Sequence, residues 1–220
     1  MPVAEKPGCS ALAPLIVPAK SFASAPLTAD MSSDIFAVNH DFTKFDLFYA
    51  GAQKNAGPAG VTMVIVKKSF MATANKNLPP MLSYAVQADK ESLYNTPPVF
   101  AIHALNLVLK HVQAEGGVAE MEKRNREKSA LIYDALDATP EIYKPTVTDK
   151  ADRSLMNITF RLATSEMETA FLKEAQAREM DGLKGHRNVG GVRASVYNAF
   201  PKEGCVALAE LIADFARRVG

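Results

Sequence analysis

Short apolar segments separated by polar turns dominate the first part of the chain. Mostly apolar residues fill 25–30, 47–50 and 61–66, and glycine or polar residues close each segment. Runs of this length, bounded by turn residues, are typical of buried strands. The third segment is rich in β-branched residues and apolar on both faces, which predicts a central strand covered on each side. Residues 69–95 carry several turn signals and are predicted to be rich in loops.

Apolar positions recur with a helical period in two segments of the middle region. The first is predicted to form a helix that begins at Thr96, whose hydroxyl can cap it, with Pro97 in the first turn. The glycines at 116–117 are predicted to end this helix. A second helix is predicted over about 118–138.

The pattern after residue 140 alternates between strands and helices. Residues 156–162 and 192–197 are predicted strands, and residues 165–180 and 202–218 are predicted amphipathic helices. This order of strand, helix, strand and helix predicts a small α/β module over residues 141–220.

The composition excludes several classes of function. The chain has 220 residues, 48% of them hydrophobic and 22% charged, and a net charge of +1. A balance of this kind produces no global field typical of a nucleic-acid-binding protein, and no apolar run reaches the roughly 20 residues of a membrane span. Cys9 and Cys205 have no metal-ligand spacing, so we expect no metal site, and a reducing cytoplasm is the simpler location.

Two charged residues follow predicted strands and lie 24 positions apart, Asp30 and Lys54. This spacing would place both at strand ends on one side of a sheet, the usual ligand side in open α/β folds. A lysine and a carboxylate are the two groups that pyridoxal phosphate needs, because the amine holds its aldehyde as a Schiff base and the carboxylate keeps its ring nitrogen protonated. On spacing alone, two solvated surface charges are the more common explanation.

Two further clusters could bind anions. Residues 184–187 and 190–193 combine three cations and a histidine with glycines, a composition that suits phosphate or carboxylate and equally suits a charged hairpin loop. Residues 94–96 precede a predicted helix and could place a phosphate at its N-terminus, although a simple helix cap is the commoner explanation.

These segments together resemble a known family. The order and approximate spacing of five motifs are similar to those of the phosphoserine aminotransferase family, which are class-V aminotransferases of fold type I. The similarity covers about residue 25 to the C-terminus. The motifs are 29–35, 49–60, 94–98, 116–121, and 184–187 together with 190–195.

The resemblance implies an α/β fold that combines a remnant of the large mixed-sheet domain with a small C-terminal α/β domain. We expect residues 24–140 to form the partial cofactor-binding domain, residues 141–220 the small domain, and residues 1–23 an irregular leader unlike the family. Family members carry much more chain before the aspartate strand. We therefore expect an N-terminally truncated form whose sheet has unpaired edges, and which is poorly stable and weakly active or inactive.

The resemblance also implies a function. The expected cofactor is pyridoxal 5'-phosphate, and the expected assembly is a homodimer. The expected reaction transfers an amino group between phosphoserine and 2-oxoglutarate, which becomes glutamate, in serine biosynthesis. In bacteria a related substrate feeds pyridoxine biosynthesis. We expect small-molecule substrates and neither nucleic acid nor a membrane as a partner.

The motif match assigns roles to individual residues. Lys54 resembles the catalytic Schiff-base lysine, Asp30 the partner of the pyridine nitrogen, and Gln53 a ligand of the cofactor phosphate. One pair resembles the residues that reach the cofactor phosphate of the neighbouring subunit: Asn95 and Thr96. Three side chains resemble ligands of the substrate anions: His186, Arg187 and Arg193.

Two alternatives stay open. The first is another fold-type I enzyme, such as an alanine–glyoxylate-type aminotransferase or a cysteine desulfurase, although the basic cluster argues against it. The second is a non-catalytic fragment that pairs with a full-length subunit through an exposed surface.

Overall fold

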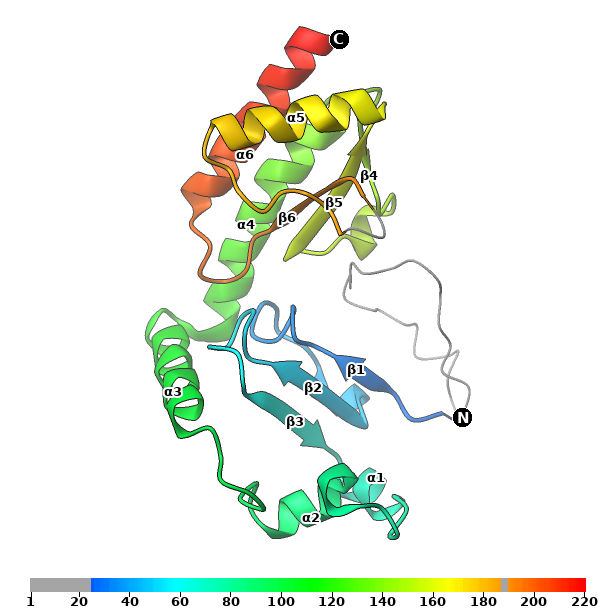
Figure 1. The fold of residues 1–220 in the computed structure, drawn as a ribbon, viewed down its shortest axis with the longest axis vertical. Coiled ribbons are helices and arrows are strands. Elements are labelled where there is room, and N and C mark those ends of the chain that lie inside the picture. Colours follow the sequence, from blue (N-terminus) through cyan, green and yellow to red (C-terminus); the bar gives the residue numbers. More distant parts are fainter. Residues whose placement is uncertain (1–24, 187–189) are drawn as a thin grey trace. The chain divides into compact units, whose positions relative to one another are not determined.

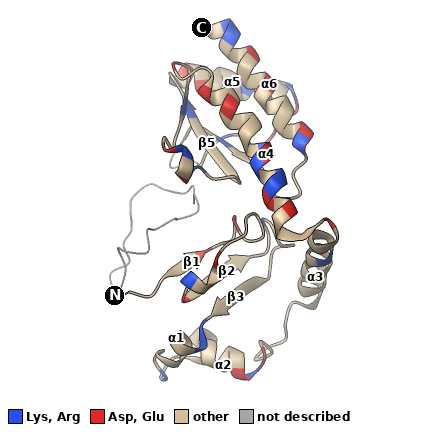
Figure 2. Ribbon diagram, turned by 180° about the vertical axis from the view of Figure 1, so that it is seen from behind, with Lys and Arg blue, Asp and Glu red and all other residues tan. Residues whose placement is uncertain are grey.

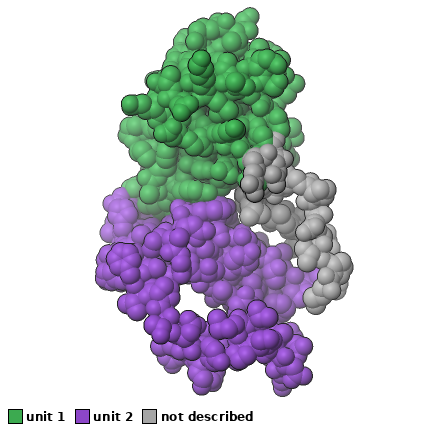
Figure 3. Space-filling model, in the orientation of Figure 1, with its two compact units in different colours: residues 1–16, 120–220 green, residues 17–119 purple. Residues whose placement is uncertain are grey.

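The structure is a computed structural model that describes residues 25–186 and 190–220. The described residues up to Ala119 belong to one compact unit and those from Glu120 onward to another, and we call them the N-terminal and the C-terminal unit (Figure 3). The predicted domain boundary near residue 140 stays a prediction. No helix within the described ranges is both long enough and apolar enough to span a lipid bilayer.

A three-stranded mixed sheet forms the centre of the N-terminal unit (Figure 1). Its strands are β1 (Thr28–Asp30), β2 (Leu47–Gly51) and β3 (Thr62–Val66). β1 and β2 are parallel and place Asp30 beside Tyr49, whereas β2 and β3 are antiparallel. The three predicted strands are therefore present.

The prediction that the third strand is central is wrong for the described sheet. The strand order is β1-β2-β3, so β2 occupies the centre and β3 an edge. Val64 and Ile65 on β3 are 38% and 44% exposed. An apolar sequence indicates that both faces of a strand favour cover, but it does not specify the neighbours of that strand.

Short helices occupy the region predicted to be loop-rich. They are followed by the longer helix α3 (Val99–Ala114). This helix begins three residues later than predicted, because a residue that precedes proline is disfavoured in the helical conformation and both Thr96 and Pro97 precede prolines. Pro98 is the N-cap, and no side chain caps the helix. The short elements of this region are α1 (Lys68–Ala72), the 3-10 helix Pro80–Leu82 and α2 (Tyr84–Asp89). Another 3-10 helix, Phe42–Lys44, lies between β1 and β2.

The C-terminal unit contains an antiparallel sheet of three strands in the order β4-β5-β6. Apart from the three-residue strand β4, its main elements lie close to the predicted segments. The short alternation in β4 was too brief to predict a strand. The elements are α4 (Gly117–Asp137), β4 (Tyr143–Pro145), the 3-10 helix Lys150–Asp152, β5 (Asn157–Leu162), α5 (Ser165–Ala177), β6 (Val192–Ser195) and α6 (Lys202–Val219).

One apolar core joins α4, α5 and α6 to this sheet. At its centre the Phe171 ring makes edge-to-face contacts with three other aromatic rings, those of Tyr143, Phe160 and Phe215. Figure 2 shows Lys, Arg, Asp and Glu distributed along the three helices, which is the pattern of amphipathic helices with one face in a core.

Candidate active site

The parallel pairing of β1 and β2 brings the two candidate cofactor residues to the same edge of the sheet. Asp30 is the last residue of β1, and Lys54 lies three residues beyond the end of β2. The carboxyl ends of parallel strands form the usual ligand side of such sheets. The predicted placement of Asp30 and Lys54 is therefore present in the fold, while their roles remain to be tested.

The Asp30 carboxylate is held by several donors. Ser32 donates to Asp30 Oδ1 from its hydroxyl at 2.5 Å and from its backbone N–H at 2.9 Å. Burial opposes ionisation of this carboxyl, but the Ser32 hydrogen bonds, a hydrogen bond from Tyr49 and the charge of Lys54 together lower its pKa below the ordinary value. Asp30 is therefore a carboxylate at neutral pH, and Lys54 lies within its electrostatic reach.

Ser32 also links the two strand ends. Its Oγ accepts a hydrogen bond from Gly51 N–H at 2.9 Å, at the end of β2. In the sequence, the position of Ser32 two residues after an aspartate at a strand end is the only signal of this bridging role. Tyr49 was missed as a partner of Asp30, because their contact depends on the register of β1 against β2.

The turn that carries Lys54 is fixed by backbone and side-chain hydrogen bonds. The Ala52 carbonyl accepts from Ala56 N–H at 3.0 Å and from Gly57 N–H at 2.7 Å. The buried Asn55 side chain donates to the Ser33 carbonyl at 3.1 Å, which ties this turn to the loop after Asp30. Lys54 itself is exposed, so the fixed turn presents its side chain to solvent.

Gln53 lies beside Lys54 on the same turn, and its side-chain amide packs over Gly51. A Cβ at Gly51 would meet Gln53 Oε1 at 2.6 Å, so a side chain at this position would have to displace the amide. Gln53 is exposed like Lys54. The chemistry of this edge, with a primary amine, an ionised carboxylate and an amide donor, fits a phosphorylated pyridine aldehyde such as pyridoxal phosphate.

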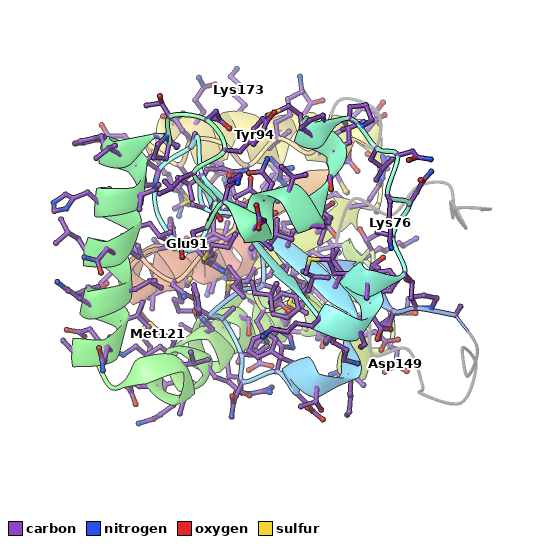
Figure 4. All side chains as sticks on the ribbon, turned by 90° about the horizontal axis from the view of Figure 1, so that it is seen from below. Lys76, Glu91, Tyr94, Met121, Asp149 and Lys173 are labelled. Atoms are coloured by element: carbon purple, nitrogen blue, oxygen red, sulfur yellow. The ribbon has the colours of Figure 1, made fainter. Side chains whose placement is uncertain are left out.

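Asn95 and Thr96 lie in the segment between α2 and α3, where Figure 4 labels the neighbouring Tyr94. Both are exposed, and Asn95 Nδ2 donates to the Thr96 carbonyl at 3.2 Å. Because α3 begins only at Val99, the prediction that this pair sits at a helix N-terminus is wrong. A role for the pair in phosphate binding stays a prediction.

The basic cluster of the C-terminal unit forms a hairpin that leads into β6. Lys184 pairs with Val192, the Gly185 N–H donates to the Gly191 carbonyl at 2.9 Å, and the Gly190 N–H donates to the His186 carbonyl at 2.8 Å. A Cβ at Gly185 would lie 2.0 Å from the Gly190 carbonyl oxygen, which makes glycine necessary there. His186 is exposed on this hairpin, and Arg187 lies outside the described residues.

Arg193 on β6 is partly buried. Its Nε is buried and has no hydrogen-bond partner within the described part of the chain. The side chain lines a pocket of about 400 Å³ that Met180, Leu183 and Phe200 also line. A guanidinium with an unsatisfied buried N–H is suited to an anionic ligand, because a buried donor without a partner is costly.

The sequence matches a defined protein family. Residues 9–208 match the model of the family described as aminotransferase class-V. A phosphoserine aminotransferase from Lysinibacillus sphaericus (strain C3-41) is 54% identical over 195 residues, which cover 89% of this chain and 54% of that relative. The chain thus spans about half the length of the relative.

Solved aminotransferase structures share the fold. A phosphoserine aminotransferase from Bacillus circulans subsp. alkalophilus superimposes with a TM-score of 0.84 at 50% identity, over 90% of this chain and 54% of the other. A pyridoxal-phosphate-bound phosphoserine aminotransferase from Trichomonas vaginalis gives a TM-score of 0.78 at 34% identity, over 86% of this chain and 54% of the other. The predicted α/β fold with a mixed sheet is confirmed by these similarities.

Proposed function

Because the chain belongs to the class-V aminotransferase family, as the resemblance of its motifs predicts, we propose that it binds pyridoxal phosphate and takes part in amino-group transfer between phosphoserine and 2-oxoglutarate. One observation carries the proposal. Parallel strands β1 and β2 present an ionised Asp30 and the amine of Lys54 at the same sheet edge. Amine and carboxylate at this edge are the pair that the cofactor requires.

The residues of this edge have separate tasks. The cofactor, when bound, supplies an aldehyde that condenses with amines and a ring that accepts electrons. Asp30 would stabilise a positive charge at the ring nitrogen, and the Ser32 and Tyr49 hydrogen bonds keep that carboxylate oriented. The Lys54 amine would hold the cofactor through its aldehyde, and as a free amine it would move the proton at the substrate α-carbon.

The C-terminal unit would supply the substrate anion ligands. In this proposal Arg193 pairs with the α-carboxylate, and His186 with Arg187 pairs with the phosphate group. A doubly charged phosphate neutralises such a cluster, whereas alanine or serine would leave its charges unpaired, and this difference favours phosphoserine.

The proposal includes the predicted assembly and context. In a homodimer Asn95 and Thr96 would reach the cofactor phosphate of the second subunit, and Gln53 would bind the phosphate within its own subunit. The pathway would be serine biosynthesis, with a related phosphorylated substrate in pyridoxine biosynthesis, in the cytoplasm.

Cofactor attachment is the first test. The purified chain is incubated with pyridoxal phosphate, reduced with borohydride, digested and analysed by mass spectrometry. We expect the cofactor mass on the peptide that contains Lys54 and its loss in Lys54→Ala. The exposed Lys76 provides a matched control, because Lys76→Ala should label as the unchanged chain does. Label spread over several surface lysines would contradict a specific site.

Substrate choice is the second test, and it separates the proposal from another aminotransferase. Phosphoserine and unphosphorylated donors are compared with 2-oxoglutarate as acceptor. A preference of at least tenfold for phosphoserine, about 1.4 kcal/mol, supports the assignment. Equal rates with alanine or serine would instead favour an enzyme of the alanine–glyoxylate type.

Exposed apolar side chains near the start of α3 support a second candidate function, a non-catalytic role in pairing with another subunit. Val99 and Phe100 at the start of α3 are 68% and 81% exposed, and Leu93 nearby is 60% exposed. Contiguous exposed apolar side chains are typical of surfaces that bind another polypeptide. A non-catalytic role in pairing would predict no Lys54 label in the isolated chain and co-purification with a full-length subunit expressed beside it.

A further inference from the structure

Lys128 on α4 is a buried cation with no part in the proposed chemistry. Its residue is 3% exposed. Its Nζ donates to four backbone carbonyls of one segment, those of Val196 at 3.1 Å, Tyr197 at 2.8 Å, Asn198 at 3.4 Å and Phe200 at 3.2 Å. Burial lowers the pKa of this amine, and no carboxylate in the described part of the chain pairs with it.

Carbonyl oxygens that converge on one point form the kind of site that binds a cation. Backbone carbonyls pointing the same way repel one another unless a positive charge lies between them, and their dipoles replace the water around that charge. A buried ammonium without such oxygens would be strongly destabilising. The ammonium of Lys128 and the carbonyl segment therefore stabilise each other.

The segment held in this way directly follows the strand that carries Arg193. Residues 196–200 connect β6 to α6, and Val196 is three positions after Arg193. Other polar contacts fix the same segment: Asn125 Nδ2 donates to Asn198 Oδ1 at 2.8 Å, and the Val196 N–H donates to the Met156 carbonyl at 2.8 Å. Lys128 contacts this segment through the carbonyls of four of its residues.

The end of β6 is also tied to β5. The Ser195 hydroxyl donates to Asn157 Oδ1 at 3.0 Å, and the Tyr197 hydroxyl donates to the same oxygen at 3.2 Å. Arg193 and Ser195 share one face of β6, because side chains two positions apart point to the same side of a strand. A displacement of residues 196–200 would therefore move Ser195 and, with it, the guanidinium of Arg193.

We propose that Lys128 is a positioning residue, whose ammonium occupies a cation site made by the carbonyls of residues 196–200 and thereby fixes the end of β6 and Arg193. The value of that position for substrate binding rests on the proposed function. The local order itself does not, because it follows from contacts within the C-terminal unit.

Amide hydrogen exchange in the full chain tests the local effect. Three reporters lie on β6 and on the segment that follows it: the N–H groups of Arg193, Val196 and Phe200. They donate to the carbonyls of Leu183, Met156 and Tyr197, respectively. Lys128→Met keeps the length and removes the charge. We expect their exchange to accelerate at least tenfold while amides of α5 keep their rates. Lys123→Met, at an exposed position of the same helix, should change none of them.

Chemical rescue separates the charge from the filled volume. In Lys128→Ala, added propylammonium should restore slow exchange of the three reporters, and propanol, which is similar in size and uncharged, should not. Equal rescue by both would overturn the proposal. Unchanged exchange in Lys128→Met would overturn it too, because the ammonium would then have no ordering effect. A uniform rise across the chain, or global unfolding of both Lys128→Met and Lys128→Ala, would overturn it because the effect would not be local.

Phosphoserine binding is measured by calorimetry on the unchanged chain, Lys128→Met and Lys128→Arg. This experiment distinguishes a failure of the present inference from a failure of the proposed function. A weaker affinity in Lys128→Met that is recovered in Lys128→Arg connects the local order to Arg193. If the unchanged chain binds no phosphoserine, the proposed function fails, and the exchange and rescue results still decide the role of Lys128.

Discussion

The two units differ in how completely their apolar residues are buried. Nineteen buried residues form one cluster in the C-terminal unit, whereas six form the cluster of the N-terminal sheet, counted over the described residues. The large exposed apolar side chains show the opposite distribution, and most of them lie between Tyr49 and Leu107. The groups proposed to hold the cofactor thus lie on the unit with the smaller core.

The larger core and the proposed cofactor site thus belong to different units of the chain. The C-terminal unit has one extensive core, because its helices cover its sheet. The N-terminal unit has a well-defined local site, in which Asp30, Ser32 and the Lys54 turn are joined by hydrogen bonds, on a sheet whose β3 edge is exposed. We therefore expect core substitutions in the C-terminal unit to change stability, and substitutions at Asp30 or Lys54 in the N-terminal unit to change cofactor binding.

The largest effect is expected from Phe171→Ala in the C-terminal core. Phe171 is fully buried, and its ring is 5.4 Å from the ring of Phe215 and 5.9 Å from that of Phe160. The cavity left behind should lower the free energy of unfolding by about 3–5 kcal/mol. Urea unfolding followed by far-UV circular dichroism measures this change, and a loss below about 1 kcal/mol would show that the core is loosely packed.

The next largest effect is expected from Asp30→Asn, which should weaken cofactor binding. Loss of a hydrogen bond to a charged group costs about 1.5–3 kcal/mol, so the affinity for pyridoxal phosphate should fall roughly ten- to a hundredfold. A titration monitored by absorbance gives the dissociation constant. Unfolding free energy should change much less than in Phe171→Ala.

Asp41→Asn is a matched control for Asp30→Asn. Asp41 accepts hydrogen bonds from the hydroxyl and backbone N–H of Thr43, two residues later, in the same way that Asp30 accepts from Ser32. It lies in the same unit, as the N-cap of the exposed 3-10 helix Phe42–Lys44. If both variants lose cofactor affinity equally, the effect reflects a general role of such turns and Asp30 has no special function.

A smaller effect is expected at Asp137, which anchors the end of α4 in the C-terminal unit. Arg153 forms two hydrogen bonds of 2.8 Å with its carboxylate, and Lys150 adds an ion pair at 2.8 Å. The Arg153 hydrogen bonds, partly offset by burial, lower the pKa of Asp137 from 3.8 to about 2. We expect Asp137→Asn to cost about 1–2 kcal/mol at neutral pH, less than the full shift implies because solvent screens the pair.

The pH dependence of this pair has a definite sign. The folded state binds the proton more weakly than the unfolded state, so the contribution is complete above about pH 4 and is lost as the pH falls towards 2. Acid unfolding curves of the unchanged chain and of Asp137→Asn should therefore converge below that range. Curves that stay parallel down to pH 2 would assign the acid sensitivity to other carboxylates.

The sequence predicted the helices and strands better than it predicted strand order and register. Three strands of the first half, the helix that became α4 and the elements from residue 156 onward were predicted, because each has its own hydrophobic period. The edge position of β3 and the partners of Asp30 depend on strand order and register, which no local pattern specifies. The start of α3 was misplaced because the bias of consecutive prolines outweighed a good capping residue.

The role of Lys128 likewise could not be predicted from the sequence. In the sequence it is one lysine of a charged helix, and helix periodicity gives no reason to separate it from Lys123. Its four acceptors lie 68 to 72 residues away in the sequence. Only the packed C-terminal unit brings them together.

The smallest effect is expected from Val64→Thr, and it tests the comparison most directly because β6 offers the same substitution in the other sheet. Val64 on β3 is 38% exposed, whereas Val192 on β6 is 1% exposed. Threonine has nearly the shape of valine and keeps the preference for strands, so the added hydroxyl is the main change. At Val192 a buried hydroxyl without a partner should cost about 1–3 kcal/mol. At Val64 water satisfies the hydroxyl, and the unfolding free energy should change by less than about 0.5 kcal/mol.

Equal losses of unfolding free energy at the two positions, measured by urea unfolding at several protein concentrations, would mean that Val64 is covered in solution. A loss at Val64 that grows with protein concentration would then identify a second copy of the chain as the cover, and the contrast between the two units would hold only for the isolated chain.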